Sequence, residues 1–132
     1  ENRIRHPLVE SGFDKKDVRS VARQLGIPLW DKPAFACLGS RFPVGTEVTQ
    51  ERVVKIGRLE SLLRIYGFRQ FRVRFHELED RSMVRIELSP EDIPSLVQEG
   101  VRDAILQAGK EEGFDWVTVD LGGYVRGGLS EA

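Results

Sequence analysis

Two short segments with strictly alternating apolar and polar residues constrain the fold more than any other feature of this chain. Phe71–Phe75 and Val84–Leu88 each place apolar side chains at every second position, which is the pattern of a strand with one buried face. Residues 76–82 between them are charged and turn-like. The sequence therefore predicts two neighbouring strands that share one apolar face and one charged face.

Helical patterns surround these strands. Thr49 is a suitable N-cap for a helix that runs to about Tyr66, and its apolar residues recur at helical spacing. Ser89 and the following proline open a second helical segment. We expect Gly100 to break this segment and a further helix to end near Gly113.

A third strand is predicted over residues 116–121. The order helix, strand, strand, helix, strand favours an α/β (α+β) class with a small ferredoxin-like sheet and helices covering it. The first forty residues carry a helix that begins at Asp14 and stops at Gly26, and they do not fit this layer. We therefore expect two domains, residues 1–45 as the end of one unit and 46–132 as a carboxyl-terminal domain.

Composition excludes several classes of protein. The chain holds 20 Lys and Arg against 21 Asp and Glu, a net charge of −1, so a nucleic-acid partner is not expected. Neither a membrane span nor an apolar signal segment is present in the sequence. One cysteine, Cys37, makes no internal disulfide and no cluster that needs several thiolates. A reducing, cytoplasmic setting is the expectation.

The charged face of the two predicted strands is the first candidate site. Alternation places Arg72 and Arg74 on it, with Arg85 and Glu87 on the neighbouring strand. Arginines that converge with Arg41 of the upstream loop would bind phosphate or carboxylate through paired hydrogen bonds. The alternative is a solvated face on which arginines pair with Glu87 across the strands.

Three further residues are of types that carry chemistry, and each has a structural interpretation. Cys37, close to Arg41, is either a thiolate nucleophile or a small buried apolar residue. Glu60 lies at the edge of the apolar helix stripe, where a salt bridge to Arg64 accounts for it. His76 has no metal-ligand or triad spacing to Cys37 and is expected on the surface.

The loop and the strands together resemble a known family. Residues 7–19 and 25–28 resemble the closing part of a PP-loop ATP pyrophosphatase domain, the adenine nucleotide α-hydrolase-like fold. The segments Trp30–Ala34 and Cys37–Arg41 resemble the WxKPA…CLASR region of LarE-type ATP-dependent sacrificial sulfur transferases. Further segments continue that pattern in order: Gly67-Phe68, Arg72–Arg74, Arg85–Glu87 and Asp120–Tyr124.

The resemblance implies an activity and its partners. The family adenylates a carboxylate of a pyridinium mononucleotide and then inserts sulfur from one of its own cysteines, in the synthesis of the nickel-pincer nucleotide of lactate racemase. ATP and magnesium are implied, without an iron–sulfur cluster, because cluster-bearing relatives need three cysteines. Trimer-based hexamers are implied as the assembly.

The resemblance also assigns roles to residues. Cys37 would be the sulfur donor, although the motif also allows its neighbour Ala36 to occupy the donor position. Glu60 would be an essential acidic residue and a candidate for the base. Glu87 matches an acidic position at a subunit junction, where metal or phosphate binds. Phosphate and carboxylates of the substrate would be held by Ser40, Arg41, Arg72, Arg74 and Arg85.

The chain departs from the family at its amino-terminal side. The Ser-Gly-Gly-x-Asp-Ser phosphate loop is absent, so we expect this chain to be the carboxyl-terminal part of the enzyme, inactive by itself, with the PP-loop region upstream or on a separate chain. Two alternatives remain open: a non-catalytic oligomerisation module that binds anions or nucleotides, and a PP-loop relative that thiolates tRNA.

Overall fold

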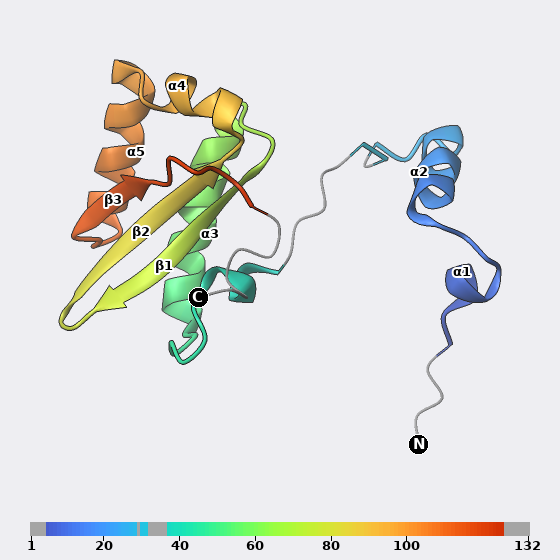
Figure 1. The fold of residues 1–132 in the computed structure, drawn as a ribbon, viewed down its shortest axis with the longest axis horizontal. Coiled ribbons are helices and arrows are strands. Elements are labelled where there is room, and N and C mark those ends of the chain that lie inside the picture. Colours follow the sequence, from blue (N-terminus) through green and yellow to red (C-terminus); the bar gives the residue numbers. More distant parts are fainter. Residues whose placement is uncertain (1–4, 29, 32–36, 126–132) are drawn as a thin grey trace. The chain divides into compact units, whose positions relative to one another are not determined.

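The computed structural model describes residues 5–28, 30–31 and 37–125. The chain divides into two compact units, Glu1–Ala34 and Phe35–Ala132, which are drawn in Figure 1. Sequence analysis placed the boundary after residue 45. The segment 37–45 packs with the second unit, because its turn contacts a helix and a strand there.

The first unit holds two helices, α1 (Pro7–Glu10) and α2 (Lys15–Gln24). Helix α2 begins at Asp14 as predicted, and a capping box joins Asp14 to Asp17: each carboxylate accepts from the other residue's backbone N–H. None of the unit's described residues is buried, and Leu25 is 70% exposed. The apolar stripe of α2 therefore forms no core of its own.

The second unit is a three-stranded sheet with helices on one face (Figure 1). Its elements are η1 (Leu38–Arg41), α3 (Gln50–Ile65), β1 (Phe71–Leu78), β2 (Arg81–Leu88), η2 (Pro90–Asp92), α4 (Ile93–Leu96), α5 (Glu99–Glu111) and β3 (Trp116–Val119). This mixed helix and sheet arrangement confirms the α+β class and agrees with a small ferredoxin-like domain.

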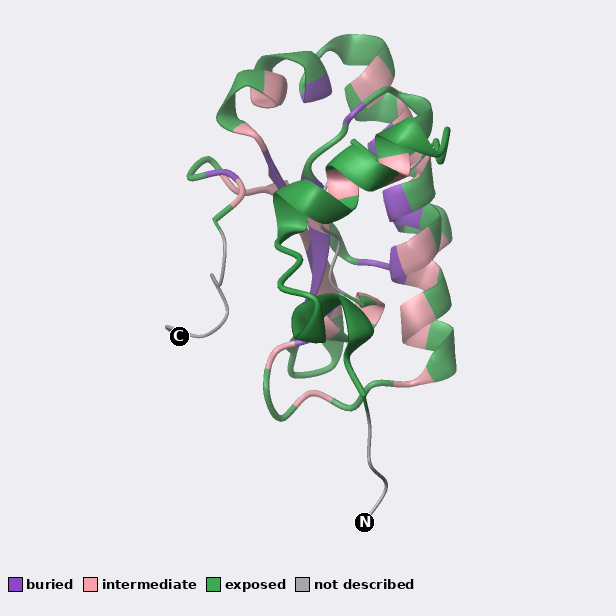
Figure 2. Cartoon of the chain, turned by 90° about the vertical axis from the view of Figure 1, so that its right-hand side faces the viewer, coloured by how far each residue is buried: buried purple, intermediate pink, exposed green. Residues whose placement is uncertain are grey.

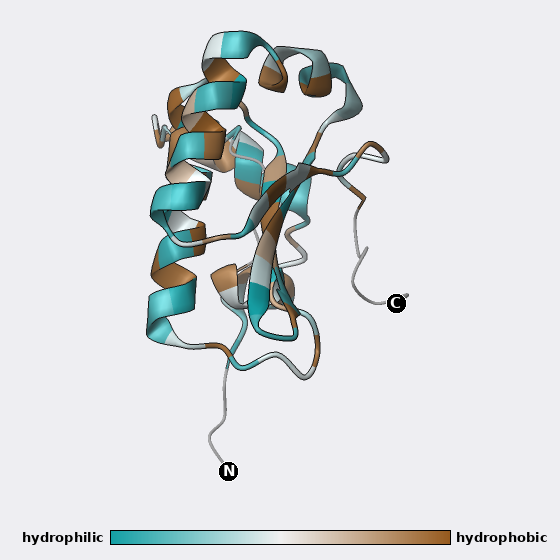
Figure 3. Cartoon of the chain, turned by 90° about the vertical axis from the view of Figure 1, so that its left-hand side faces the viewer, coloured by the Kyte–Doolittle hydropathy of each residue, from teal (hydrophilic) through white to brown (hydrophobic). Residues whose placement is uncertain are grey.

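The strand order is β1-β2-β3. Strands β1 and β2 are antiparallel, with Phe71 opposite Leu88 and Arg74 opposite Arg85. Strand β3 lies parallel to β2 after the crossover through α4 and α5. Hydrophobic residues run along the strands of the sheet in Figure 3. The register fixes which side chains share each face.

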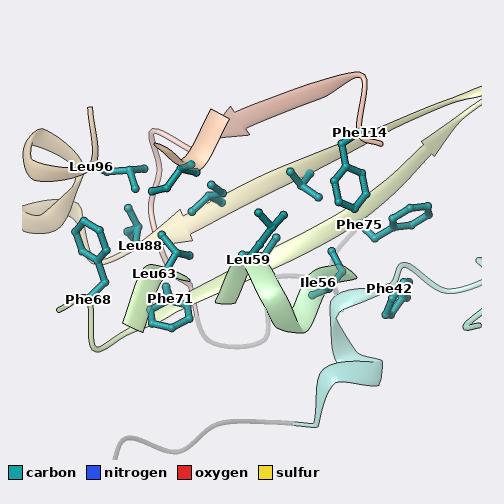
Figure 4. Close-up of a cluster of buried hydrophobic side chains, with 14 residues drawn as sticks. Phe42, Ile56, Leu59, Leu63, Phe68, Phe71, Phe75, Leu88, Leu96 and Phe114 are labelled. Carbon is teal, nitrogen blue, oxygen red and sulfur yellow. The ribbon is translucent and has the colours of Figure 1, made fainter. Parts of the chain in front are cut away.

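The core lies between the sheet and its helices. The apolar residues at alternate positions of β1 and β2 are buried on the side of helix α3, whose own buried apolar side chains point to the sheet (Figures 2 and 4). The cluster comprises Phe42, Ile56, Leu59, Leu63, Phe68, Phe71, Val73, Phe75, Val84, Ile86, Leu88, Leu96, Ile105 and Phe114. Burial of this apolar face leaves the alternate strand residues on the opposite face, as the sequence pattern predicted.

Several element boundaries differ from the sequence prediction. The turn between the strands is confined to residues 79–80, because β1 and β2 extend into the charged segment. Glu79 there adopts φ = 55°. Gly100 does not break the second helical region: it lies within α5, and the break falls at Val97 and Gln98. The Ser89 side chain makes no cap hydrogen bond.

Helix α5 approaches β3 closely at one point. A Cβ added to Gly109 would lie 2.2 Å from Cγ2 of Val117, far inside van der Waals contact. The glycine is therefore required here by packing, whereas Gly100 of the same helix has open space around it.

Candidate functional site

The cysteine lies at the start of a short turn beside the sheet. Cys37 immediately precedes η1 and is exposed, with a free thiol. The Ser40 hydroxyl donates to the Cys37 carbonyl at 2.9 Å, and the Ser40 backbone N–H donates to the same oxygen at 3.1 Å. The interpretation of Cys37 as a small buried apolar residue is therefore wrong, and its thiol is open to reaction.

Arg41 and Glu60 form a buried ion pair that the sequence did not predict. Arg41 Nε donates to Glu60 Oε1 at 2.6 Å and Nη2 donates to Oε2 at 3.3 Å. Both side chains are 1% exposed. The Val73 backbone N–H also donates to Oε1, at 3.3 Å, so the carboxylate binds the outer edge of β1.

The predicted salt bridge of Glu60 to Arg64 is present as well, at 3.4 Å. Both carboxylate oxygens of Glu60 thus accept hydrogen bonds. Arg41 in turn donates from Nη1 to the Ser40 hydroxyl at 3.0 Å. Glu60 is therefore placed to position the cysteine turn, residues 37–41, through its contact with Arg41.

The arginine face comprises Arg72, Arg74 and Arg85, on the side of the sheet away from α3 and α5. The strand register places these side chains on one face, as the alternation predicted. Arg74 is 1% exposed, and its Nε donates to Glu87 Oε1 at 2.7 Å. Arg85 Nη2 donates to the same oxygen at 3.1 Å. The cross-strand pairing offered as the structural alternative is therefore present.

The chain segment after β3 contributes two further groups to this face. Arg85 Nε lies 3.4 Å from an oxygen of Asp120. Arg72 Nη2 donates to the Tyr124 hydroxyl at 2.9 Å, and its guanidinium lies 4.6 Å from the centre of the Tyr124 ring. Sequence reasoning gave neither Asp120 nor Tyr124 a role in the site. The third strand was predicted over residues 116–121, but it ends at Val119, and both residues follow it.

One hydrogen bond joins the cysteine turn to the arginine face. Arg74 Nη1 donates to the Ser40 carbonyl at 3.0 Å. Ser40 therefore contacts Cys37, Arg41 and Arg74 at once. Arg72 lies on the same sheet face as Arg74. Ala36, the other candidate for the sulfur-donor position, lies outside the described residues. The hydrogen-bond network that results comprises Cys37, Ser40, Arg41, Glu60, Arg74, Arg85 and Glu87.

His76 is a member of the same face that sequence reasoning missed. Its side chain is partly buried. Burial, chiefly, and then the charges of Arg85 and Arg74 lower the pKa of His76 below its usual 6.5, while Glu87 opposes this effect. Alternation places residue 76 on the side of Arg72 and Arg74, so the pattern already held the signal.

The described residues contain no group of three or more metal-ligating side chains. Glu87, the predicted metal ligand, lies between two guanidiniums, whose charge disfavours a cation. These residues by themselves do not form a metal site. In the described part of the chain, no helix is long and apolar enough to cross a membrane.

Fold and site together define a small α+β domain in which buried arginine–carboxylate pairs hold an exposed cysteine. The chain is 44% identical over 126 residues to an uncharacterized protein of Synechocystis sp., covering 96% of this chain and 46% of that protein. It is 36% identical over 124 residues to the pyridinium-3,5-bisthiocarboxylic acid mononucleotide synthase of Lactiplantibacillus plantarum, covering 94% and 43%.

An uncharacterized protein of Methanocaldococcus jannaschii is 30% identical over 121 residues, covering 92% of this chain and 44% of that protein. The chain therefore spans less than half the length of each of these relatives. No protein-family profile matches it. The similarity to the Lactiplantibacillus synthase supports the LarE-like relationship that the motifs indicated.

Proposed function

We propose that this chain is part of an ATP-dependent sulfur transferase in the synthesis of the nickel-pincer nucleotide, with a pyridinium mononucleotide as substrate. The observation that carries the proposal is the hydrogen bond from Arg74 to Ser40, since it holds an exposed cysteine next to an arginine-rich sheet face. A thiol beside guanidiniums suits sulfur transfer to an anionic substrate. The name of the Lactiplantibacillus relative supports the substrate class.

The proposed chemistry has three steps. The substrate carboxylate attacks ATP, which gives an acyl adenylate and releases pyrophosphate. The thiolate of Cys37 then attacks the acyl carbon and displaces AMP, forming a thioester. A base removes the cysteine Cα proton, the cysteine C–S bond breaks, and the product leaves as a thiocarboxylate while residue 37 becomes dehydroalanine.

The residues of the network divide this work. Arg72, Arg74 and Arg85 hold the phosphate and carboxylates of the substrate, and Ser40 and Arg41 set the position of the cysteine turn. Glu60 acts through Arg41 as a positioning residue, because both its oxygens are already occupied. ATP and magnesium bind mainly to a PP-loop region that this chain does not hold, and the enzyme assembles as a trimer or hexamer.

Mass spectrometry of the full-length protein that carries this chain tests the proposal. The protein is incubated with ATP, magnesium and the pyridinium mononucleotide, and the peptide containing residue 37 is analysed. We expect a mass loss of one hydrogen sulfide at Cys37 and no product from Cys37→Ala. Cys37→Ser, which keeps the size of the side chain, is the matched control for folding and is expected to be inactive also. An intact Cys37 together with full turnover by Cys37→Ala would refute sacrificial chemistry at this residue.

A second candidate function is a non-catalytic module that binds anions or nucleotides. The observation in its favour is that the three guanidiniums of the arginine face contact two carboxylates, Glu87 and Asp120, among the described residues, which leaves positive charge for an anion. Arg72→Gln removes the guanidinium that contacts the hydroxyl and the ring of Tyr124. Loss of nucleotide binding in this variant, together with an intact Cys37 after the incubation with ATP, magnesium and the mononucleotide, would favour the module over the enzyme.

A further inference from the structure

Arg72 is the member of the arginine face that contacts no carboxylate within the part of the chain that the structure describes. Arg74 and Arg85 both donate to Glu87. Arg72 instead donates from Nη2 to the Tyr124 hydroxyl at 2.9 Å, and its guanidinium lies 4.6 Å from the centre of that ring. Because a phenol that keeps its proton carries no negative charge, this contact leaves the positive charge of Arg72 uncompensated.

The strand register makes this choice of partner unexpected. Arg72 lies directly opposite Glu87, the position at which opposite charges on adjacent strands pair. Oxygen Oε1 of Glu87 accepts from Arg74 at 2.7 Å and from Arg85 at 3.1 Å. Oxygen Oε2 is buried and has no hydrogen-bond partner among the described residues. The residue opposite Arg72 therefore offers an unoccupied carboxylate oxygen, and Arg72 nevertheless contacts Tyr124.

The position of Tyr124 is set by the backbone around it. Its N–H donates to the Leu88 carbonyl at 2.7 Å, and Leu88 is the residue after Glu87 on β2. The preceding Gly123 has φ = 74°, and a Cβ added there would lie 2.8 Å from the same carbonyl oxygen. A glycine is therefore required for this approach. The backbone thus fixes the phenol beside the end of the strand pair where Arg72 lies.

A contact that serves only to tie the carboxyl-terminal segment to the sheet does not account for this arrangement. The hydrogen bond to Leu88 and the close approach of Gly123 already make that connection. Arg72 is also the more accessible guanidinium, since its side chain is partly exposed whereas Arg74 is 1% exposed. The Tyr124 side chain thus acts on an arginine that a ligand can reach.

We propose that Tyr124 is a positioning residue, which holds the guanidinium of Arg72 away from Glu87 and open to an anionic group of the substrate. The Tyr124 hydroxyl accepts from one nitrogen of the guanidinium, and the other N–H donors bind a phosphate or a carboxylate. Without the phenol, Arg72 turns to Glu87 Oε2 across the strands. This inference rests on the proposed function, in which Arg72 holds an anionic group of the mononucleotide.

Calorimetric titration of the full-length protein that carries this chain, without ATP, tests the inference. The ligand is nicotinic acid mononucleotide, a pyridinium mononucleotide with one carboxylate. We expect Arg72→Gln to weaken binding about tenfold, through the loss of a charge-assisted hydrogen bond. Tyr124→Ala, which leaves Arg72 in place, should weaken binding by a similar factor. Tyr124→Phe keeps the ring contact and should weaken it less, about threefold.

The double variant separates positioning from an independent effect of Tyr124. If Tyr124 acts only through Arg72, the combination of Arg72→Gln and Tyr124→Ala binds as Arg72→Gln does alone. Losses that multiply to about a hundredfold would show an independent effect and would overturn the proposal. Tyr66→Ala is the matched control, because Tyr66 is the other tyrosine of the chain and is 41% exposed at the end of α3. We expect it to leave binding unchanged, and circular dichroism checks that each variant is folded.

The outcomes distinguish this inference from the proposed function. Weaker binding by Arg72→Gln together with unchanged binding by Tyr124→Ala overturns the inference and leaves Arg72 as a substrate-binding residue. Unchanged binding by Arg72→Gln, or no binding by the unchanged protein, overturns the role of Arg72 in the proposed function and the inference with it.

Discussion

The buried pair of Arg41 and Glu60 gives the strongest prediction for stability. Glu60→Gln keeps the size of the side chain but removes the charge, which leaves the guanidinium of Arg41, 1% exposed, without its main counter-ion. Breaking a buried ion pair costs about 3–5 kcal/mol. The amide oxygen of the introduced glutamine can still accept from Arg41 Nε and the Val73 N–H, so we expect a loss near the lower end, about 3 kcal/mol of unfolding free energy.

Urea unfolding followed by circular dichroism measures this loss. Glu51→Gln is the matched control, because Glu51 lies on the same helix α3 and pairs with Lys55 at 2.7 Å, but is 76% exposed. An exposed pair of this kind contributes less than about 1 kcal/mol. If Glu60→Gln cost no more than this control, Arg41 and Glu60 would not be holding the cysteine turn against α3 and β1, and the assignment of Glu60 as a positioning residue would be refuted.

Three other predictions follow from contacts described above. Gly109→Ala should lower the unfolding free energy by about 1–3 kcal/mol through overpacking against β3. Gly100→Ala in the same helix should raise it by up to about 1 kcal/mol. Equal effects of the two substitutions in urea unfolding would contradict the close approach of α5 to β3 at Gly109. Tyr124→Phe removes the hydroxyl that accepts from Arg72 and should cost about 1 kcal/mol, with a smaller effect than Tyr124→Ala, which also removes the ring contact. The lowered pKa of His76 means that the unfolded chain binds a proton first as the pH falls. Stability should therefore decrease as the pH is lowered from about 6.5 through the folded-state pKa, and unfolding measured across this range should show a smaller slope in His76→Gln; an unchanged slope would assign the pH dependence to other groups.

The local pattern of the sequence predicted the elements of the second unit well. Alternation identified β1 and β2 and the face that each arginine occupies, because the side chains of a strand point alternately to its two faces. Capping chemistry located the starts of α2 and α3, where Asp14 and Thr49 accept hydrogen bonds from the first turn. Gly100 was misjudged, because a helix tolerates glycine in its first turn when tertiary contacts hold the rest of it.

The resemblance to sulfur transferases also came from sequence, and the similarity to the Lactiplantibacillus synthase supports it. It assigned roles to Cys37, Glu60 and the arginines. These roles remain predictions, which the mass spectrometry and the binding measurements described above test directly.

Sequence by itself thus determined strands β1 and β2, the starts of α2 and α3 and the identity of the charged face, since these depend on residues a few positions apart. Only the tertiary structure decided which charged groups are buried and which partners they bind. Arg41 donates to Glu60, 19 residues further along the sequence, and Arg74 donates to Ser40, 34 residues before it. Such pairs leave no periodic signal, because they form only when the packed sheet and α3 bring distant segments together. The same packing buries polar atoms of Arg74, Arg85, His76 and Glu87.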